Sequence, residues 1–338
     1  MRILLATDAW APQVNGVVMT LRNTIRGVEQ AGHTVEVIGP DRFRSVPCPT
    51  YPEIRLALSP FSLFARLAKR FAPDAVHIST EGPVGMAARR FCLREGLGFT
   101  TAYHTRFPEY VHARVRLPVR FSYRWLRHFH GPAKAVMVAT PAIHADLEQW
   151  GFDNLVMWSR GVDTELFRPG PRLDNGWRRP VFMYVGRVAV EKNIEAFLAL
   201  DLPGTRVVVG DGPQRASLQR RFPAVVFTGA KVGEELAAHF RSADVFVFPS
   251  RTDTFGLVLL EAIASGTPAA AFPVAGPIDV IVPGRSGVLS HDLRGAALAA
   301  LALPRDAVRE EALRFSWDQA TSQFLRHLHP NHATPRFA

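Results

Sequence analysis

The amino-acid sequence predicts an α/β protein of two doubly wound, Rossmann-like domains with parallel sheets, facing each other across a cleft. Short apolar runs alternate with segments of helical spacing along most of the chain, a pattern that favours parallel sheets covered by helices. One stretch rich in Pro, Gly and charge, residues 161–180, interrupts this alternation and is the predicted linker. A chain of 338 residues is long enough for two separate cores.

Ten apolar runs are predicted strands, five on each side of the linker. In the N-terminal domain, residues 1–160, they are Arg2–Ala6, Thr34–Gly39, Ala75–Ile78, Phe99–Tyr103 and Ala135–Ala139. In the C-terminal domain, residues 181–314, they are Val181–Gly186, Thr205–Gly210, Val225–Thr228, Val245–Pro249 and Pro268–Phe272. Helical spacing separates them; Val17, Leu21, Ile25 and Val28, for example, recur at intervals of three and four.

Composition and charge narrow the class of protein. An apolar content of 47% with a mean hydropathy of +0.03 indicates a globular chain, and no transmembrane helix or secretory signal is expected. The two cysteines, Cys48 and Cys92, have no metal-ligand spacing, which favours the cytoplasm. Residues 1–160 hold 20 Lys and Arg against 12 Asp and Glu, so this half should meet an anionic partner: nucleic acid, a membrane or a phosphorylated substrate.

Two carboxylates eight positions apart mark the strongest candidate site. Asp253 precedes a Gly-containing turn, and Glu261 lies in the apolar run that follows. If Phe255-Gly256 opens a helix, its first free amides bind anions, with Asp253 at the mouth and Glu261 two turns deeper. This arrangement suits a nucleotide sugar, which has hydroxyls at both ends and phosphate between. On spacing alone, a capped helix with one satisfied core Glu is an equally good interpretation.

In doubly wound sheets ligands bind beyond the carboxyl ends of the strands, so the loops there were the next candidates. Gly16 opens the helix after the first strand, where a ligand can approach the backbone, although an ordinary Asn-Gly turn fits equally well. Arg187 and Lys192 follow Gly186 and could clamp a diphosphate, with a solvated helix start as the alternative. His104 ends a predicted strand and is a better functional candidate than His77.

The segment from Gly210 to Pro213 is only a weak dinucleotide fingerprint, because Arg215 stands where the third Gly is needed. A dinucleotide-dependent oxidoreductase is therefore not favoured. A nucleic-acid-binding protein would fit the basic charge, but no binding motif of that class is present.

Taken together, these segments resemble the retaining glycosyltransferases of glycosyltransferase family 4, which have the GT-B fold. The resemblance covers nearly the whole chain. It is carried by Val185-Gly186-Arg187 with Lys192, Val209-Gly210-Asp211-Gly212-Pro213, Ser242-Ala243-Asp244-Val245 and Leu260-Glu261-Ala262. The end of the chain, Phe315-Ser316-Trp317-Asp318, is similar to the closing helix of the family, so residues 315–330 should return to the N-terminal domain.

The resemblance also implies residue roles. Asp253 and Glu261 match the Glu-x7-Glu motif of the family, with Asp in place of the first Glu. Asp253 and the amides of Thr254, Phe255 and Gly256 would hold the hydroxyls of the donor sugar, and Glu261 those of the ribose. Arg187 and Lys192, beside Gly186, match the pair that neutralises the diphosphate, and Gly16 matches a loop Gly near the phosphates. His104 matches the His near the reacting end of the donor. The catalytic set implied is His104, Arg187, Lys192 and Asp253.

The chemistry of the reaction agrees with these roles. Breaking a glycosyl–phosphate bond develops negative charge on the diphosphate, which fixed cations and helix amides stabilise. No Asp-x-Asp motif occurs, so neither a metal nor another cofactor is expected beyond the nucleotide-sugar co-substrate. The resemblance implies front-face attack with retention.

Two clusters of basic and aromatic residues bear on the acceptor. Arg116, Arg120, Arg124 and Arg127 form one stripe if the segment after Pro118 is helical, with Phe121, Trp125 and Phe129 beside them. A second cluster combines Phe61, Leu63, Phe64, Leu67 and Phe71 with Arg66, Lys69 and Arg70. Either cluster fits a helix on anionic lipid or an ordinary core face with solvated arginines. The two together favour a peripheral enzyme on the inner face of the cytoplasmic membrane.

Three N-terminal segments resemble those of diacylglycerol glycosyltransferases and related mannosyltransferases. They are Thr7-Asp8-Ala9-Trp10-Ala11-Pro12 with Asn15-Gly16-Val17, Glu81-Gly82-Pro83-Val84-Gly85, and the run from Tyr103 to Tyr110. The predicted function is transfer of a hexosyl or uronosyl group from a nucleotide sugar, with a UDP sugar favoured, to diacylglycerol or a glycolipid. A GDP-mannose-dependent α-mannosyltransferase is the alternative, and the sequence leaves the oligomeric state open.

Overall fold

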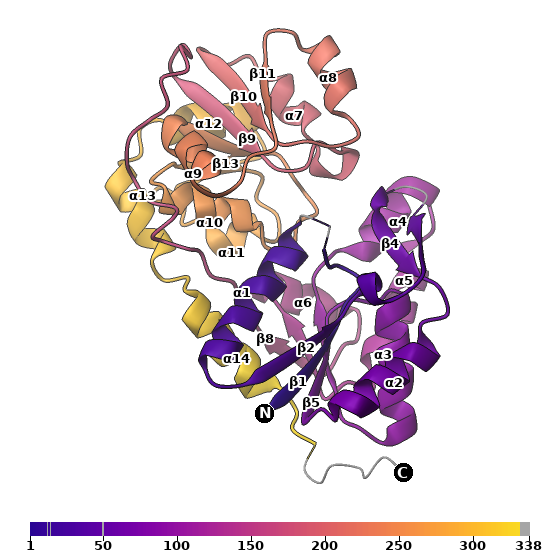
Figure 1. Ribbon diagram of the computed structural model, residues 1–338. Coiled ribbons are helices and arrows are strands. Elements are labelled where there is room, and N and C mark those ends of the chain that lie inside the picture. The colour runs from indigo at the N-terminus through magenta and orange to yellow at the C-terminus, as the bar shows by residue number, and fades with distance from the viewer. Residues whose placement is uncertain (12, 14, 49–50, 332–338) are drawn as a thin grey trace. The chain divides into compact units, whose positions relative to one another are not determined.

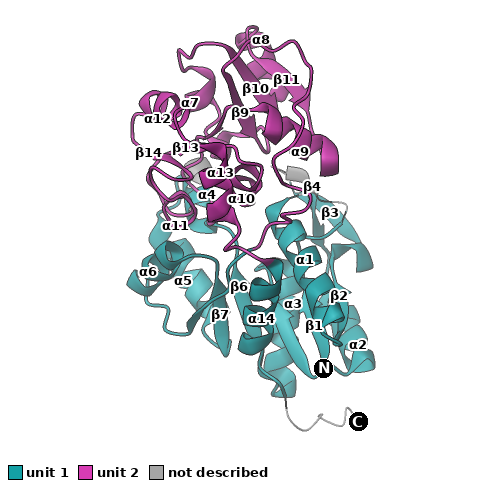
Figure 2. Ribbon diagram, turned by 90° about the vertical axis from the view of Figure 1, so that its left-hand side faces the viewer, with its two compact units in different colours: residues 1–160, 317–338 teal, residues 161–316 magenta. Residues whose placement is uncertain are grey.

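Two six-stranded parallel sheets form the centres of two structural units. The computed structural model describes residues 1–11, 13, 15–48 and 51–331. Unit 1 comprises Met1–Arg160 and Trp317–Ala338, and unit 2 comprises Gly161–Ser316 (Figure 2). The α/β class with two doubly wound sheets is thereby confirmed.

The sheet of unit 1 has the strand order β2-β1-β5-β6-β7-β8. Its strands are β1 (Arg2–Ala6), β2 (Thr34–Ile38), β5 (Ala75–Ile78), β6 (Thr100–Tyr103), β7 (Ala135–Val138) and β8 (Leu155–Met157). Ile3 pairs in parallel with Val35 on one side and Ala75 on the other. The strand order reverses between β1 and β5, which makes the loops after these strands the switch point, where such sheets bind ligands.

Helices flank this sheet (Figure 1). They are α1 (Gly16–Gln30), α2 (Phe61–Phe71), α3 (Pro83–Glu95), α4 (Phe107–Val115), α5 (Val119–His130), α6 (Pro141–Gln149) and α14 (Trp317–His327). An excursion after β2 carries the short helix η1 (Pro40–Arg42) and the antiparallel hairpin of β3 (Ser45–Cys48) and β4 (Tyr51–Ala57).

The last helix, α14, belongs to unit 1 although unit 2 precedes it in the chain. Figure 1 shows it beside α1, and the two helices approach so closely at Gly27 that a Cβ there would lie 2.3 Å from Thr321 Oγ1. Phe324 is buried against Trp158, with ring centroids 5.0 Å apart, and the Ser159 amide donates to Gln323 Oε1 over 2.8 Å. The predicted return of the C-terminal helix is confirmed.

Unit 2 has the strand order β11-β10-β9-β12-β13-β14, so its switch point lies between β9 and β12. Its strands are β9 (Val181–Val185), β10 (Thr205–Val209), β11 (Val226–Gly229), β12 (Val245–Phe248), β13 (Ala269–Ala271) and β14 (Gly287–Leu289). Its helices are η2 (Val190–Lys192), α7 (Glu195–Leu198), α8 (Arg215–Arg221), α9 (Gly233–Ser242), α10 (Leu257–Ala264), α11 (Pro277–Val280), α12 (Leu293–Ala300) and α13 (Arg305–Ala312).

Residues 161–180, the predicted linker, lack regular helices and strands but pack as part of unit 2. Phe167 is buried there, and Arg309 Nη1 donates to its carbonyl oxygen over 3.1 Å. Among the described residues, no helix combines the length and the apolar character needed to span a membrane.

Candidate functional site

Two loops meet at the switch point of unit 2, one after β9 and one after β12. Asn193 lies in the left-handed region with φ +50°, and its side chain donates to the Pro249 carbonyl oxygen over 3.0 Å. The Thr252 hydroxyl donates to the Glu191 carbonyl oxygen over 3.1 Å. Each loop thus donates one side-chain hydrogen bond to a backbone carbonyl of the other. These bonds fix the loop after β9, which contains Arg187 and Lys192, against the loop after β12, which contains Asp253.

Lys192 and Asp253 form an ion pair across these loops. Lys192 ends η2, and its Nζ donates to Asp253 Oδ1. Both side chains are mostly buried, 23% and 16% exposed, so the pair is partly shielded from solvent. Asp253 Oδ2 is buried and has no hydrogen-bond partner within the described chain, which leaves one oxygen of this carboxylate for a ligand.

Gly256 sets the direction of the chain into α10. Its φ of +86° is the left-handed conformation that Gly adopts without strain, and the helix begins at Leu257, one residue later than predicted. Gly276 supports this turn from outside, since a Cβ there would lie 3.0 Å from the Asp253 carbonyl oxygen and 3.1 Å from that of Phe255. Phe255 is buried, whereas Thr254 is half-buried.

Glu261 lies in the second turn of α10, between Leu260 and Ala262, which are both fully buried. Its own side chain is half-buried, and burial raises the pKa of Glu261 to about 7. Of the residues that the structure describes, none forms a hydrogen bond or ion pair with this carboxylate. The core partner expected of a purely structural Glu is therefore missing, which favours the ligand-site interpretation.

The glycines near Arg187 serve backbone packing. A Cβ on Gly210 would lie 1.8 Å from the Gly186 carbonyl oxygen, and one on Gly212 would lie 2.4 Å from that of Val188. The segment that resembles a weak dinucleotide fingerprint thus supports the loop after β9. Arg187 itself is half-buried, and its carbonyl oxygen accepts a hydrogen bond from the Tyr184 hydroxyl over 2.8 Å.

At the switch point of unit 1, the buried carboxylate of Asp8 joins the loops after β1 and β5. It accepts hydrogen bonds from the amides of Val84 and Gly85, over 2.8 and 3.2 Å, and from the Thr80 hydroxyl over 2.8 Å. Burial nevertheless raises the pKa of Asp8. Sequence reasoning did not select Asp8 as a site residue, although its place directly after the first strand was visible.

Gly16 begins α1 as predicted, and Asn15 caps the helix by accepting from the amides of Val17 and Val18 over 3.0 Å each. Gly16 itself is exposed at the start of the helix. Pro12 and Val14 of the same loop lie outside the described residues.

His104 follows β6, and Arg160 holds its ring in place. Arg160 Nη2 lies 3.2 Å from His104 Nδ1. Burial, with contributions from Arg160 and His77, keeps the pKa of His104 well below its usual value. His77 is buried and bonded to Thr100 Oγ1 at 2.9 Å, as expected for a structural His. Sequence reasoning missed Arg160, because no local pattern connects it to a residue 56 positions away.

The stripe predicted on α5 is only partly correct. Arg120, Arg124, Arg127 and Trp125 are exposed on the helix, and Phe121 is 44% exposed. Arg116 is not on the stripe: the segment Leu117-Pro118 breaks the helix, and Arg116 ends α4 in the left-handed region with φ +55°. Phe129 was also misplaced, since it is buried.

The second predicted cluster, on α2, packs inward. Phe64 is fully buried against Phe91 of α3, and the Arg90 guanidinium lies 4.3 Å from the Phe61 ring centroid. Arg66 and Arg70 are exposed on the opposite side of the helix. The core interpretation is therefore correct for α2.

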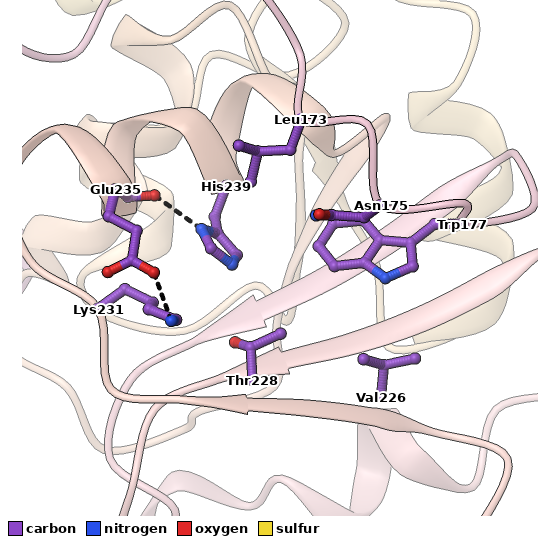
Figure 3. Close-up of a pocket in the computed structure, with 8 residues that line it drawn as sticks. All are labelled: Leu173, Asn175, Trp177, Val226, Thr228, Lys231, Glu235 and His239. Carbon is purple, nitrogen blue, oxygen red and sulfur yellow. Dashed lines mark hydrogen bonds and ion pairs between the residues drawn. The ribbon is translucent and has the colours of Figure 1, made fainter.

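A separate depression of about 370 Å³ in unit 2 involves none of the predicted site residues (Figure 3). Its lining comes from the segment 173–177, from β11 and from the segment that runs through Lys231 into α9. Three of its polar residues pair with one another: Lys231 with the Glu235 carboxylate, and His239 Nδ1 with the Glu235 carbonyl oxygen over 2.7 Å.

Across the described parts of the chain, no three His, Cys, Asp or Glu side chains converge as metal ligands would.

Comparison with known proteins matches both units to glycosyltransferase sequences. Residues 14–166 match the family described as Glycosyltransferase Family 4, and residues 179–306 match that described as Glycosyl transferases group 1. Among solved structures, sucrose-phosphate synthase from Thermosynechococcus elongatus superposes with a TM-score of 0.79 at 21% identity, covering 96% of this chain and 97% of its own. This likeness identifies the GT-B fold.

Two relatives illustrate the range of similar enzymes. A GDP-mannose-dependent alpha-mannosyltransferase of Mycobacterium tuberculosis is 31% identical, covering 96% of each chain. The sulfoquinovosyl transferase of Arabidopsis thaliana is 33% identical over 89% of this chain and 64% of its own length.

Proposed function

This chain belongs to glycosyltransferase family 4, and we propose that it transfers a hexosyl or uronosyl group, with retention, from a nucleotide sugar to diacylglycerol or a glycolipid. The donor favoured is a UDP sugar. The observation that carries the proposal is the pairing of Lys192 with Asp253 at a switch point that also contains the carboxylate of Glu261, for which the described residues supply no hydrogen-bond partner.

The donor would use the three kinds of group that these loops provide. Arg187 and Lys192 are the cations for the diphosphate, and the first turn of α10 adds backbone amides. Asp253 Oδ2, with the backbone of Thr254, Phe255 and Gly256, is available to sugar hydroxyls. Glu261 would accept hydrogen bonds from the ribose hydroxyls.

Catalysis would depend on charge at the leaving group. As the glycosyl–phosphate bond breaks, negative charge grows on the diphosphate, and cations already in place stabilise it without reorganisation. We assign this stabilisation to Arg187 and Lys192, without a divalent cation, so that EDTA should leave turnover unchanged. In the retaining mechanism proposed, the leaving phosphate takes the proton of the acceptor hydroxyl, and His104 hydrogen-bonds to the sugar.

A lipid acceptor is supported by the exposed face of α4 and α5. Phe107, Leu117, Phe121 and Trp125 are each 38–44% exposed, and Arg120 and Arg124 are exposed beside them. Aromatic rings next to arginines are typical of helices that lie on anionic lipid. We propose that this face places the enzyme on the cytoplasmic side of the membrane. A relative in Streptococcus pneumoniae, 27% identical over 97% of this chain, is named alpha-monoglucosyldiacylglycerol synthase, a name consistent with a glycolipid product.

GDP-mannose is the second candidate donor. The specific observation that favours it is the mycobacterial relative, which matches over almost its whole length and is named for that donor.

The test is incubation of the full chain with diacylglycerol vesicles and a panel of radiolabelled UDP and GDP sugars. A labelled lipid from one donor is expected, and the donor consumed decides between the two candidates. Lys192→Ala and Glu261→Ala should each abolish turnover in a folded protein, while Lys231→Ala, at the separate depression, should not. Near-normal turnover in Lys192→Ala or Glu261→Ala would refute the donor-site assignment.

A further inference from the structure

Arg160 is a buried cation without a carboxylate partner among the described residues. Its side chain is almost fully buried, since the residue is 4% exposed, and burial lowers the pKa of Arg160 to about 9. Nη1 donates to the carbonyl oxygens of Trp158 and Ser159, over 2.5 and 3.0 Å, and the guanidinium lies 4.5 Å from the Trp158 ring centroid. Burying a cation on neutral partners destabilises the fold, so its remaining contact needs an explanation.

That contact determines the tautomer of His104. A guanidinium has only donors, so at 3.2 Å from Arg160 Nη2 the His104 Nδ1 must be the acceptor. A neutral imidazole then carries its proton on Nε2. The Trp158 ring meets the imidazole at 68°, with centroids 5.6 Å apart, and restricts its rotation.

The groups around His104 also oppose its protonation. Arg160, from the segment after β8, and His77, from β5, both act on it. Arg160 is a cation and therefore opposes a second positive charge on His104. His77 is neutral, because burial and Arg160 lower its pKa to about 3. The α14 helix contributes Phe324, an apolar ring, to the same cluster.

We propose that Arg160 is a positioning residue for the transfer reaction: it keeps His104 neutral with the proton on Nε2, so that His104 donates a hydrogen bond to the transferred sugar and does not act as a general base. The inference rests on the proposed function for the identity of the ligand. A neutral ring is also the better neighbour for a sugar that gains oxocarbenium character, because an imidazolium would repel the developing positive charge.

The tautomer can be observed directly in the unmodified protein. In ¹⁵N-His-labelled enzyme, with the His104 resonances assigned by their loss in His104→Gln, a neutral Nε2–H ring is expected from about pH 8 to about pH 5. A Nδ1–H tautomer, or titration near the usual value of about 6.5, overturns the proposal. This result does not depend on any donor, so failure of the proposed function would leave it interpretable.

Two pairs of variants test the consequence for turnover. His104→Gln keeps a donor and lacks a base, whereas His104→Glu keeps a base and lacks a donor; the Gln variant should be the more active, and the reverse order overturns the proposal. In Arg160→Gln the loss of the cation should raise the pKa of His104, although burial, the larger cause of its low pKa, remains. Because Glu261 has a pKa of about 7 in both proteins, the quantity to compare is the ratio of kcat/KM in Arg160→Gln to that in the parent, which should fall as the pH is lowered. In Arg160→Lys this ratio should not change with pH. If Arg160→Gln does not fold, the comparison of the two His104 variants and the observed tautomer still test the proposal.

Discussion

At the scale of single residues, Glu261, the proposed ligand of the ribose, makes stability depend on pH. The pKa of Glu261 is about 7 in the folded chain, against an ordinary value of 4.5 that applies to the unfolded chain. Between pH 4.5 and pH 7 the folded state therefore holds a proton that the unfolded state has released. Stability is therefore lost as the pH rises from about 4.5 to about 7, by on the order of 3 kcal/mol. The carboxylate of Glu261 therefore destabilises the fold at neutral pH. Such a cost is expected where a carboxylate is needed to bind a ligand.

The Glu261→Gln variant should be more stable than the parent above pH 7, by up to about 3 kcal/mol, and nearly equal to it below pH 4.5. Its turnover should nevertheless fall strongly, because an amide cannot replace the carboxylate as the acceptor for two hydroxyls. Urea unfolding at several pH values, beside initial rates, measures both quantities. A variant less stable than the parent at pH 8 would contradict a carboxylate without a partner.

The ion pair of Lys192 and Asp253 has a consequence for product binding. In the proposed donor site, the diphosphate would replace or share Asp253 as the partner of Lys192. Asp253→Asn removes a negative charge beside the diphosphate, so UDP should bind roughly three- to tenfold more tightly. Turnover of the nucleotide sugar should fall on the order of 100-fold, because a sugar contact is lost.

Calorimetry with UDP and rate measurements separate these two effects. The exposed Asp201, substituted as Asp201→Asn, is the matched control and should change neither. UDP affinity unchanged in Asp253→Asn would mean that the pair does not compete with the diphosphate.

At the scale of elements, α2 and α5 contain similar residue types and differ in which of them they expose. Both combine aromatics with arginines, but α2 buries Phe64, whereas α5 exposes Phe121 and Trp125. Periodicity predicts that a stripe exists without stating which stripe faces the core, because that depends on the neighbouring elements.

Arg120→Glu with Arg124→Glu should weaken binding to anionic vesicles by more than tenfold, since each basic residue near the surface contributes about 1 kcal/mol. The same two charge changes on α2, Arg66→Glu with Arg70→Glu, form the matched control and should have a smaller effect. Vesicle flotation at low and high salt gives the measurement. Equal losses in both double variants would assign binding to net charge and not to the face of α4 and α5.

The elements that the sequence predicted correctly have strong local signals. The central strands are continuous apolar runs, as expected for strands covered on both sides. The strands β8 and β14 were missed, because each has only three residues and is mostly half-buried, whereas the equally short β13, which was predicted, is fully buried. At the site, the loops after β9 and β12 were predictable from their position, whereas Asn193, Gly276 and Arg160 act through contacts between distant segments.

At the scale of the whole molecule, unit 1 depends on a helix from the far end of the chain. Phe324 is 1% exposed and packs against His77 and Trp158, with ring centroids 5.0 Å away in each case. Phe324→Ala should therefore destabilise unit 1 by about 3–5 kcal/mol.

Amide hydrogen exchange locates that loss. Protection should fall in β1 and β5 and remain in β9 and β12, because these strands belong to different units. Phe197→Ala, which removes a fully buried ring of unit 2, is the control and should give the opposite pattern. A uniform loss of protection in Phe324→Ala would show that the two units unfold together.

The place of α14 has a further consequence during synthesis. As the chain leaves the ribosome, the apolar surface around Trp158 emerges early, while the helix that covers it follows only after all of unit 2. The bond between Ser159 and Gln323 spans 164 positions in the sequence. Until translation passes that point, the nascent N-terminal sheet exposes a surface to which chaperones bind and through which unfinished chains aggregate. Ribosomes stalled within unit 2 should therefore carry nascent chains that need a chaperone.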